Sequence, residues 1–265
     1  MISLAVTRYA ASQCVETTTM AVELPSDEMK GRIIGKEGRN IKAIELLTGT
    51  EIIVDDTPEM ITISGFSPIR RQVAKRALDA LIADGRIHPA RIEEAVDEAK
   101  KALAQDLRKA GEDALYQLGI PVSSIDPKLI SILGRMKFRT SYGQNALQHS
   151  IEVGLLSGLM GEELGADVFV CKKGGLFHDI GKAVDHDMQG AHPEIGYNIM
   201  KKFGFPEEIC YQSIANHEDH PKTVEGAIIK AADAISGARP GARKQSLEQF
   251  IQRMEELEKT ATSFE

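Results

Sequence analysis

The chain has 265 residues, which is enough for two ordinary domains or one large one. Hydrophobic residues make up 42% and charged residues 27%, a balance that is typical of a packed globular protein and excludes a disordered chain. The net charge of -7 argues against a broad basic surface for nucleic acid, so any such site must depend on a local basic patch, backbone amides or metal ions.

The cysteines and the ends of the chain bear on where the protein works. Cys14, Cys171 and Cys210 follow no paired spacing, which predicts reduced thiols and a cytoplasmic protein. No apolar run approaches the roughly 18–20 residues of a membrane span, so we expect no membrane contact by this chain. Helical patterns at residues 2–11 and 245–260 meet both ends without a leader or a C-cap glycine, and we expect a piece of a longer protein.

The first third of the chain mixes short strand and helix patterns. Residues 17–25 are β-branched and roughly alternating, which predicts a strand that Pro25 ends. Residues 29–42 are predicted to form two short helical pieces around a glycine turn, and Gly49 ends the second. Two strands and an amphipathic helix should follow at residues 51–55, 60–64 and 68–82. The predicted order is therefore β-α-α-β-β-α.

Beyond Gly85 the pattern is helical. Residues 90–111 combine apolar positions at helical spacing with many charges, which predicts a connector helix, and the Gly, Pro and Ser of residues 119–127 predict a boundary. From Lys128 no convincing strand appears, so this half is predicted to be all-α and the whole chain α+β. Helices are predicted at 128–136, 144–164, 167–183, 191–203, 206–216, 223–236 and 245–260. The predicted organisation is a helical lead-in (1–16), a first domain (17–85), a connector helix and linker (86–126) and a second domain (127–265).

A glycine loop lies between the two helical pieces of the first domain. Gly35-Lys-Glu-Gly38 alone is weak evidence, because a corner between two helices also needs glycine. Its extension to Ile33-Ile-Gly-Lys-Glu-Gly-Arg-Asn-Ile41, its place in the β-α-α-β-β-α order and its basic flanks make residues 17–83 resemble a KH domain.

That resemblance implies a loop that clamps the backbone of about four nucleotides of single-stranded RNA. The RNA-binding residues it implies are Arg32, Ile34, Gly35, Lys36, Glu37, Gly38 and Arg39. Glycine lets a phosphate approach the main chain, and the helix N-terminus after the loop favours an anion. Glu37 departs from a basic loop, and a KH fold used only for packing or dimerisation remains the alternative.

Six of the seven histidines fall between residues 149 and 220, in the second domain. His178 and Asp179 stand side by side after an apolar run, and Asp233 lies in another apolar run, where a carboxylate is costly to bury unless it pairs or binds a cation. The order His149, His178-Asp179, Asp233 resembles the HD hydrolase superfamily, which implies these four side chains as ligands of a divalent metal ion. Imidazoles and carboxylates suit Mn, Mg, Zn or Fe and do not choose among them.

Two further histidines are candidates for a second metal ion. His192 begins a stretch that resembles the His-Pro-x-Ile-Gly of binuclear HD phosphodiesterases, and His217 is followed by Glu218 where those enzymes often have a second histidine. The alternative is that both make hydrogen bonds to substrate or to the ligands. The remaining histidines, His88, His186 and His220, are expected in exposed loops.

Basic residues around the dyad suggest phosphate chemistry. The superfamily resemblance places Lys182 near the phosphate, so that His178, Asp179 and Lys182 are the predicted catalytic residues; a solvated helix end is the alternative for Lys182. Arg135, Lys137 and Arg139 form a basic strip that either steers a polyanion or is a solvated face.

KH followed by HD in one chain resembles the ribonuclease Y family. The stretches that carry the likeness are 31–35, 84–93, 137–145 and 238–243. The resemblance implies an endoribonuclease that starts bacterial mRNA decay, a homodimer, and RNA-decay partner proteins. It also implies a membrane anchor, a coiled coil and a C-terminal segment that this chain does not show, which would hold the full-length protein at the cytoplasmic face of the membrane.

Two other functions are compatible with these residues. HD domains also act as cyclic-dinucleotide or nucleotide phosphohydrolases, and a small nucleotide would not need the KH domain. A non-catalytic RNA-binding scaffold with a vestigial HD site is the third possibility, against which the complete set of His149, His178, Asp179 and Asp233 argues.

Overall fold

The structure is a computed structural model that describes residues 18–141 and 143–238. The predicted helices at 2–11 and 245–260, the lead-in at 1–16, Cys14 and the motif from Arg239 onward lie outside the described residues. Among the described helices, none is both long and apolar enough to cross a membrane.

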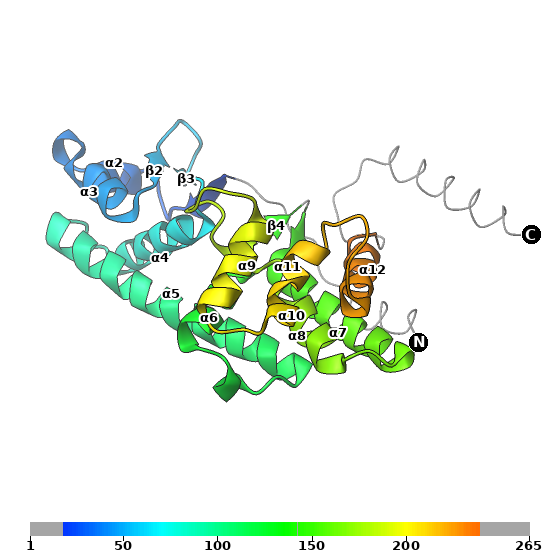
Figure 1. The fold of residues 1–265 in the computed structure, drawn as a ribbon. Helices are drawn as coiled ribbons and strands as arrows, with labels where there is room; N and C mark the ends of the chain where they lie inside the picture. Colours follow the sequence, from blue (N-terminus) through cyan, green and yellow to red (C-terminus); the bar gives the residue numbers. More distant parts are fainter. Residues whose placement is uncertain (1–17, 142, 239–265) are drawn as a thin grey trace, which may run out of the picture.

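The first unit has the predicted β-α-α-β-β-α order. Its strands β1 (Thr19–Glu23), β2 (Glu51–Ile53) and β3 (Met60–Ser64) form an antiparallel sheet in the order β1-β3-β2. Its helices are α2 (Glu28–Ile34), the short 3-10 turn η1 (Lys36–Gly38), α3 (Arg39–Thr48) and α4 (Pro68–Asp84). The glycine loop therefore joins α2 to α3 at one end of the molecule (Figure 1).

Alternation along the strands builds the core of this unit. Ile61 and Ile63 of β3 point to the same face of the sheet and are fully buried, because side chains two apart on a strand share a face. They pack with Ile33 of α2, Ile44 of α3 and Leu78 of α4 in one aliphatic cluster. The helices thus cover one face of the sheet, and the cluster holds α2 and α3 where the loop joins them.

The predicted connector helix is α5 (Pro89–Leu118), whose 30 residues span about 45 Å. Its sequence sets its start, since Pro89 occupies the first turn and the His88 side chain accepts a hydrogen bond from the Arg91 amide. The first half of α5 lies in the core of the first unit, and the residues from Ala110 to Leu118 lie in the core of the second. The helix therefore belongs to both cores and runs along the base of both units (Figure 1).

Two glycines let α5 and α6 (Pro127–Arg135) touch backbone to backbone. A Cβ on Gly111 of α5 would lie 2.1 Å from the carbonyl oxygen of Ile130. A Cβ on Gly134 of α6 would lie 1.8 Å from the carbonyl oxygen of Leu107. Both distances are far inside van der Waals contact, so only glycine permits this crossing.

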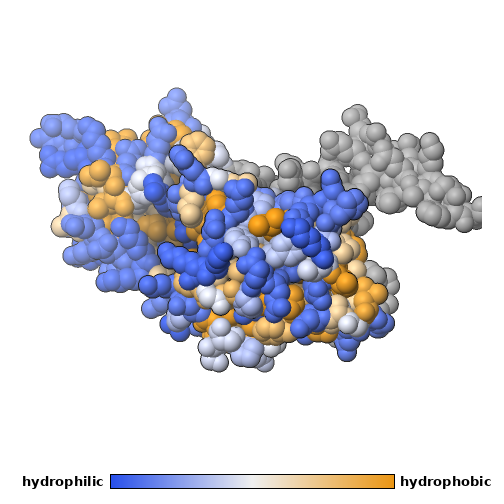
Figure 2. Space-filling model, viewed as in Figure 1, coloured by the Kyte–Doolittle hydropathy of each residue, from blue (hydrophilic) through white to orange (hydrophobic). Residues whose placement is uncertain are grey.

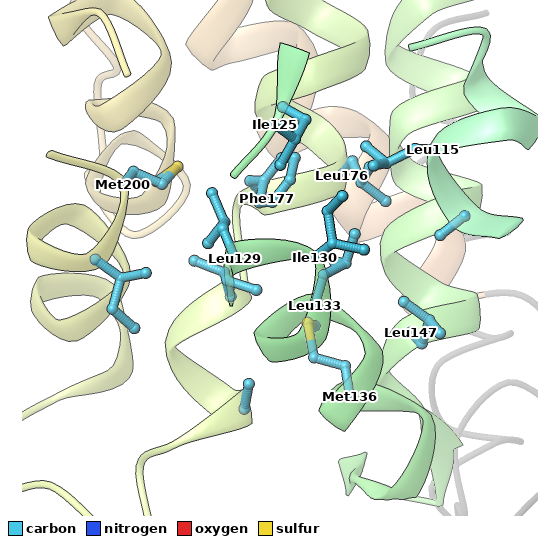
Figure 3. Packing of buried hydrophobic residues seen from close by; sticks show 14 of the residues in the cluster. Leu115, Ile125, Leu129, Ile130, Leu133, Met136, Leu147, Leu176, Phe177 and Met200 are labelled. Atoms are coloured by element: carbon cyan, nitrogen blue, oxygen red, sulfur yellow. The ribbon is translucent and has the colours of Figure 1, made fainter. Parts of the chain in front are cut away.

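The second unit is a helical bundle. It consists of α6, α7 (Ala146–Leu164), α8 (Val168–Phe177), the 3-10 turn η4 (Ile180–Ala183), α9 (His192–Lys202), α10 (Glu207–Cys210), α11 (Gln212–Ala215) and α12 (Val224–Ala238). Leu129, Ile130 and Leu133 of α6 meet Leu176 and Phe177 of α8 in its core (Figure 3). The α+β class is confirmed, and Cys171 and Cys210 are buried free thiols as predicted.

Three details of the second half differ from the prediction. Two-residue strands, β4 (Thr140–Ser141) and β5 (Gln144–Asn145), pair after the 3-10 turn η3 (Met136–Phe138), so the half is not purely helical. The helix predicted at 167–183 ends at Phe177, and that predicted at 206–216 divides into α10 and α11. The early end of α8 places the His178-Asp179 dyad in a bend between α8 and η4.

Candidate metal centre and glycine loop

Three separate helices bring together the first group of candidate ligands. His149 lies on α7, His178 follows α8, and Asp233 lies on α12. Their ligand atoms all lie within 4.8 Å of one another. His149 Nε2 is 2.9 Å from Asp233 Oδ1, so residues 84 positions apart along the chain meet at one point, as predicted.

Hydrogen bonds behind the imidazoles fix which nitrogen faces this point. His178 Nδ1 is 2.7 Å from the carbonyl oxygen of Gly175, and because a carbonyl only accepts, this nitrogen carries the proton. His149 Nδ1 is 2.9 Å from Ser236 Oγ, whose hydroxyl donates to Glu152 Oε2 at 2.8 Å. With its hydroxyl proton used in this way, Ser236 accepts from His149. Both Nε2 atoms therefore present lone pairs to the centre, which is the arrangement of metal-binding histidines.

The lone pairs need a cation. His178 Nε2 and Asp179 Oδ1 are buried and have no hydrogen-bond partner within the described part of the chain. His178 Nε2 also lies 3.3 Å from Asp179 Oδ2, so two acceptor atoms face each other in the interior. Buried acceptors of this kind are stabilised when a positive ion lies between them. The donor set therefore fits a divalent metal ion.

The same proximity shifts the pKa values of the acidic ligands. Burial opposes ionisation of Asp233, but in the metal-free protein the imidazoles of His149 and His178, when they are protonated at Nε2 as well, outweigh it and lower the pKa of this carboxyl below its usual value. Burial likewise opposes ionisation of Asp179, yet His178 holds the pKa of Asp179 well below the usual range. Asn216 Nδ2 donates to Asp233 Oδ2 at 2.9 Å and adds to the effect. Both carboxylates are thus charged at neutral pH and ready to bind a cation.

A second group lies next to the first, and its member Asp179 also approaches His178 of the first group. Ligand atoms of Asp179, His192 and His217 lie within 4.8 Å of one another. His192 Nε2 is 3.2 Å from His217 Nε2 and 3.4 Å from Asp179 Oδ1, while Asp179 Oδ2 faces His178. The two oxygens of Asp179 therefore point into different groups, as a carboxylate that bridges two ions would.

Glu218 and the three remaining histidines lie outside the second group. Glu218 accepts a hydrogen bond from the Tyr211 hydroxyl at 2.5 Å and is not part of the group. His88 caps α5, and His186 and His220 lie in loops. Within residues 18–141 and 143–238, these three histidines join neither group.

Lys182 reaches the centre from η4. Its Nζ lies 2.5 Å from Asp179 Oδ2, and only 17% of its side chain is exposed, so it is not a solvated helix end. Together with His149 and Asp179 it lines a small pocket closed by Ser141, Gln144 and Ala146. A phosphate oxygen that reaches this pocket would meet the Lys182 ammonium, His149 and Asp179.

The glycine loop is shaped by backbone angles that favour glycine. Gly35 has φ 70° and ψ 171°, and Gly38 has φ 72°. A Cβ on Gly35 would lie 2.6 Å from Asn40 Nδ2, whereas a Cβ on Gly38 would find no atom closer than 3.7 Å. The Asn40 amide donates to the carbonyls of Arg32 and Ile87, which ties the loop to the start of α5. Gly35 is thus needed for the fold, and Gly38 leaves open space before α3.

The basic residues near the loop fall into two sets. Lys30 pairs with Asp27 at 3.0 Å, and Arg32 donates to the carbonyl oxygen of Gly85, so both are engaged within the fold. Lys36, Glu37 and Arg39 are exposed at the loop, and Ile34 is half-buried beside it. Hydrophilic residues cover this end of the molecule in the view of Figure 2. Of the two predicted arginines, Arg39 is the better placed to meet a ligand.

Residues behind the ligands were not foreseen from the sequence. Glu152 and Ser236 are buried and hold His149, and Gln144 Nε2 donates to Ser236 Oγ at 3.2 Å. A signal was present, because Glu152 follows His149, and Ser236 follows Asp233, by three residues on a helix, which places each pair on one face.

Comparison with known proteins agrees with this geometry. A KH domain profile matches residues 19–80, and an HD domain profile matches residues 146–238. The fold and the site thus define a class of protein in which a KH domain is joined to an HD domain. The first is α+β and the second helical, as predicted.

Similarity along the whole of this chain identifies the family. The chain is 56% identical to ribonuclease Y of Thermoanaerobacter pseudethanolicus, 54% to that of Desulforamulus reducens and 53% to that of Syntrophotalea carbinolica, each over 100% of this chain. It belongs to the ribonuclease Y family. The chain spans about half of the length of these relatives, covering 52%, 52% and 51% of them. No solved structure matches it.

Proposed function

We propose that the chain is the catalytic part of a metal-dependent endoribonuclease, which hydrolyses phosphodiester bonds of single-stranded RNA and initiates bacterial mRNA decay. The observation that carries the proposal is that Asp179 lies between two groups of ligands, with Lys182 2.5 Å from one of its oxygens. Membership of the family supports it, because the relatives are named ribonuclease Y.

The proposed ligands are the two groups, with Asp179 added to the first because one of its oxygens lies 3.3 Å from His178 Nε2. His149, His178, Asp233 and Asp179 would hold one ion, and Asp179, His192 and His217 would hold a second. Mn, Mg, Zn and Fe all accept imidazole and carboxylate ligands. When bound, such an ion lowers the pKa of a water toward neutrality and polarises a phosphoryl oxygen.

The chain's own residues bind and orient the substrate. Lys182 neutralises negative charge that builds up on the phosphate. Because Lys182 lines the pocket, its ammonium group is already in place before the reaction begins. The hydrogen bonds from His178 to Gly175 and from His149 to Ser236 hold the imidazoles still. In the first unit, Lys36, Arg39 and the open backbone at Gly38 would contact RNA phosphates, with Arg32, Ile34, Gly35 and Glu37 shaping the loop.

The organisation of the protein is proposed on the same basis. An RNA-binding unit at 17–85 and a hydrolase unit at 127–265 would be joined by the helix and linker of 86–126, with 1–16 leading in. We propose a homodimer, interaction with other RNA-decay proteins, and a cytoplasmic location in which a segment outside this chain anchors the full-length protein to the membrane. Mass measurement of the full-length protein in solution tests the first of these.

Replacement of the dyad tests the catalytic assignment. His178→Ala with Asp179→Ala should abolish cleavage of a 5′-labelled single-stranded RNA, because two ligands are lost, while RNA binding in a gel shift persists. His220→Ala is the matched control. Because this histidine lies outside both groups, the variant should cleave RNA as the parent does. Cleavage by the double variant at the parental rate would place the nuclease centre elsewhere.

The same assay separates the competing functions. The parent should cleave RNA with at least one divalent ion and stop when a chelator is added. Turnover of a cyclic dinucleotide or a nucleotide without RNA cleavage would make the protein a phosphohydrolase. RNA binding without hydrolysis or bound metal would make it a scaffold.

A further inference from the structure

A second groove lies beside the metal centre and is lined from both units. The first unit contributes the start of α4, and the second contributes the end of α6 and the segments around β4 and η4. Its lining residues are Ser67, Pro68, Ile69, Arg135, Arg139, Lys182, Ala183, His186 and Asp187. Lys182 also lines the pocket of the metal centre, so a single side chain lies between the groove and the ligands.

Both arginines that line the groove pair with aspartates, and of the two acids Asp187 lines the groove as well. Arg135 donates to Asp187 Oδ2 at 2.7 Å, and Arg139 donates to Asp185 Oδ2 at 3.2 Å. The arginines come from the basic strip seen in the sequence, and both acids come from the loop after η4. Burial and the charge of Arg139 lower the pKa of His186, which therefore adds a neutral imidazole rather than a charge.

The Arg135–Asp187 pair is open to replacement. The Asp187 side chain is 39% exposed and lies in a loop, whereas the Arg135 side chain is 24% exposed and projects from a packed helix. Only one guanidinium nitrogen of Arg135 bonds Asp187, and its Nε is buried without a hydrogen-bond partner among the described residues. Guanidinium binds a phosphate through two parallel hydrogen bonds as readily as it binds a carboxylate.

We propose that this groove binds a backbone phosphate of the RNA next to the one that is cleaved, with Asp187 as an internal competitor for Arg135. The inference rests on the proposed function. It explains why the groove is lined by both units, since a strand held by the glycine loop must pass from the first unit to the metal centre in the second. In the absence of RNA, Asp187 neutralises Arg135; RNA phosphate takes its place.

Opposite changes in affinity distinguish this role from a structural ion pair. Binding of a fluorescent single-stranded RNA to the full chain is measured with chelator present, at several salt concentrations. Arg135→Gln should weaken binding roughly tenfold, since a charged hydrogen-bond partner is lost. The slope of log affinity against log salt should also fall by about 0.7, the value for one phosphate contact on a single strand. Asp187→Asn should strengthen binding about twofold, since an exposed competing pair is removed.

The control is an exposed ion pair of the same kind. Arg108 and Glu112 of α5 pair at 2.8 Å and do not line the groove. Arg108→Gln and Glu112→Gln carry the same charge changes, so they correct for the effect of net charge on RNA affinity. The thermal transition of each variant is recorded, because loss of an ion pair should move it in the same direction for Arg135→Gln and Asp187→Asn.

The outcomes are distinct. Affinity changes of opposite sign that exceed those of the controls support the groove. Weaker binding by both variants, or changes equal to those of the controls, overturns it and leaves a structural ion pair. If the parent cleaves RNA and the signs are not opposite, the groove alone fails. If the signs are opposite but no divalent ion supports RNA cleavage, the groove stands and the nuclease assignment falls.

Discussion

Replacing Ser236 by alanine should weaken metal binding without disturbing the fold. The Ser236 hydroxyl is 1% exposed, lies 2.9 Å from His149 Nδ1 and donates to Glu152 Oε2 at 2.8 Å. Through this chain of hydrogen bonds, the Glu152 carboxylate and the Ser236 hydroxyl hold the His149 ring with Nε2 toward Asp233. Alanine keeps the packing and removes only the oxygen.

Ser236 hydrogen-bonds to the side of His149 that faces away from the proposed ion. Loss of such a partner of a metal ligand typically lowers metal affinity by about tenfold to a hundredfold. This corresponds to roughly 1.4–2.7 kcal/mol of binding free energy. Calorimetric titration of Mn²⁺ into chelator-treated protein measures it directly, without reliance on catalysis.

Ser157→Ala is the matched control for Ser236→Ala. Ser157 is also buried, at 0% exposed, but its hydroxyl has no hydrogen-bond partner in the described part of the chain. Removing an unpaired buried hydroxyl should leave metal affinity unchanged and stability unchanged or slightly higher. Parental Mn²⁺ affinity in Ser236→Ala, with an intact fold, would refute the idea that this serine positions His149.

Three further results are expected. Gly38→Asp should lower RNA affinity in a gel shift, because the new carboxylate repels phosphate, and should destabilise the fold less than Gly35→Ala does. The left-handed φ of 72° strains any side chain at Gly38, but a Cβ has room there, whereas a Cβ on Gly35 meets Asn40; equal effects on stability would contradict the geometry of the loop. His192→Ala should remove about one metal equivalent per chain in elemental analysis, and an unchanged metal content would assign His192 to hydrogen bonding. In metal-free protein, ionised Asp233 should stabilise the fold, because the pKa of this carboxyl is lower in the folded than in the unfolded protein. This stabilisation is present above about pH 4, near the unfolded pKa, and should be lost as the pH falls through the lower folded pKa. A free energy of unfolding in urea that does not change with pH in this range would refute it.

The parts of the fold that follow local rules were predictable. Gly49 and Gly85 end α3 and α4 in left-handed conformations, and Pro68 and Pro89 begin α4 and α5, so the breaks between elements were visible in the residue types. The strand predicted at 60–64 matches β3 to the residue. The grouping of the candidate ligands was predictable as well, because a histidine–aspartate dyad and a lone carboxylate in apolar runs are hard to explain without a cation.

Other features depend on contacts that no local pattern encodes. The apolar pattern of 167–183 continues through the dyad, so the sequence predicted one helix. In the structure, the Ser213 hydroxyl donates to the carbonyl oxygen of His178 at 2.9 Å, beyond the end of α8, where a continuing helix would have used that carbonyl. Strands of two residues, as in β4 and β5, are too short to show any alternation.

The packing role of two helical glycines was the feature of the fold that the sequence predicted least. Gly111 and Gly134 look like weak points of α5 and α6, since glycine lowers helix propensity. Only the crossing of the two helices shows that a larger residue would meet a carbonyl oxygen at about 2 Å. The cost of glycine to each helix is therefore offset by the close packing that it allows between them.

The position of α5 changes how the two units should be understood. The sequence predicted a connector between separate domains, yet α5 supplies buried residues to both cores, and Asn40 ties the glycine loop to Ile87 just before α5 begins. A strand of RNA held at the loop would therefore meet the metal centre along a rigid helix rather than across a flexible linker. It also follows that the two units should unfold together, because loss of either core leaves half of α5 exposed. A variant that damages the loop through Gly35 would then lower the stability of the metal centre as well, whereas a variant at Gly38, where a side chain has room despite the left-handed φ, should lower it less.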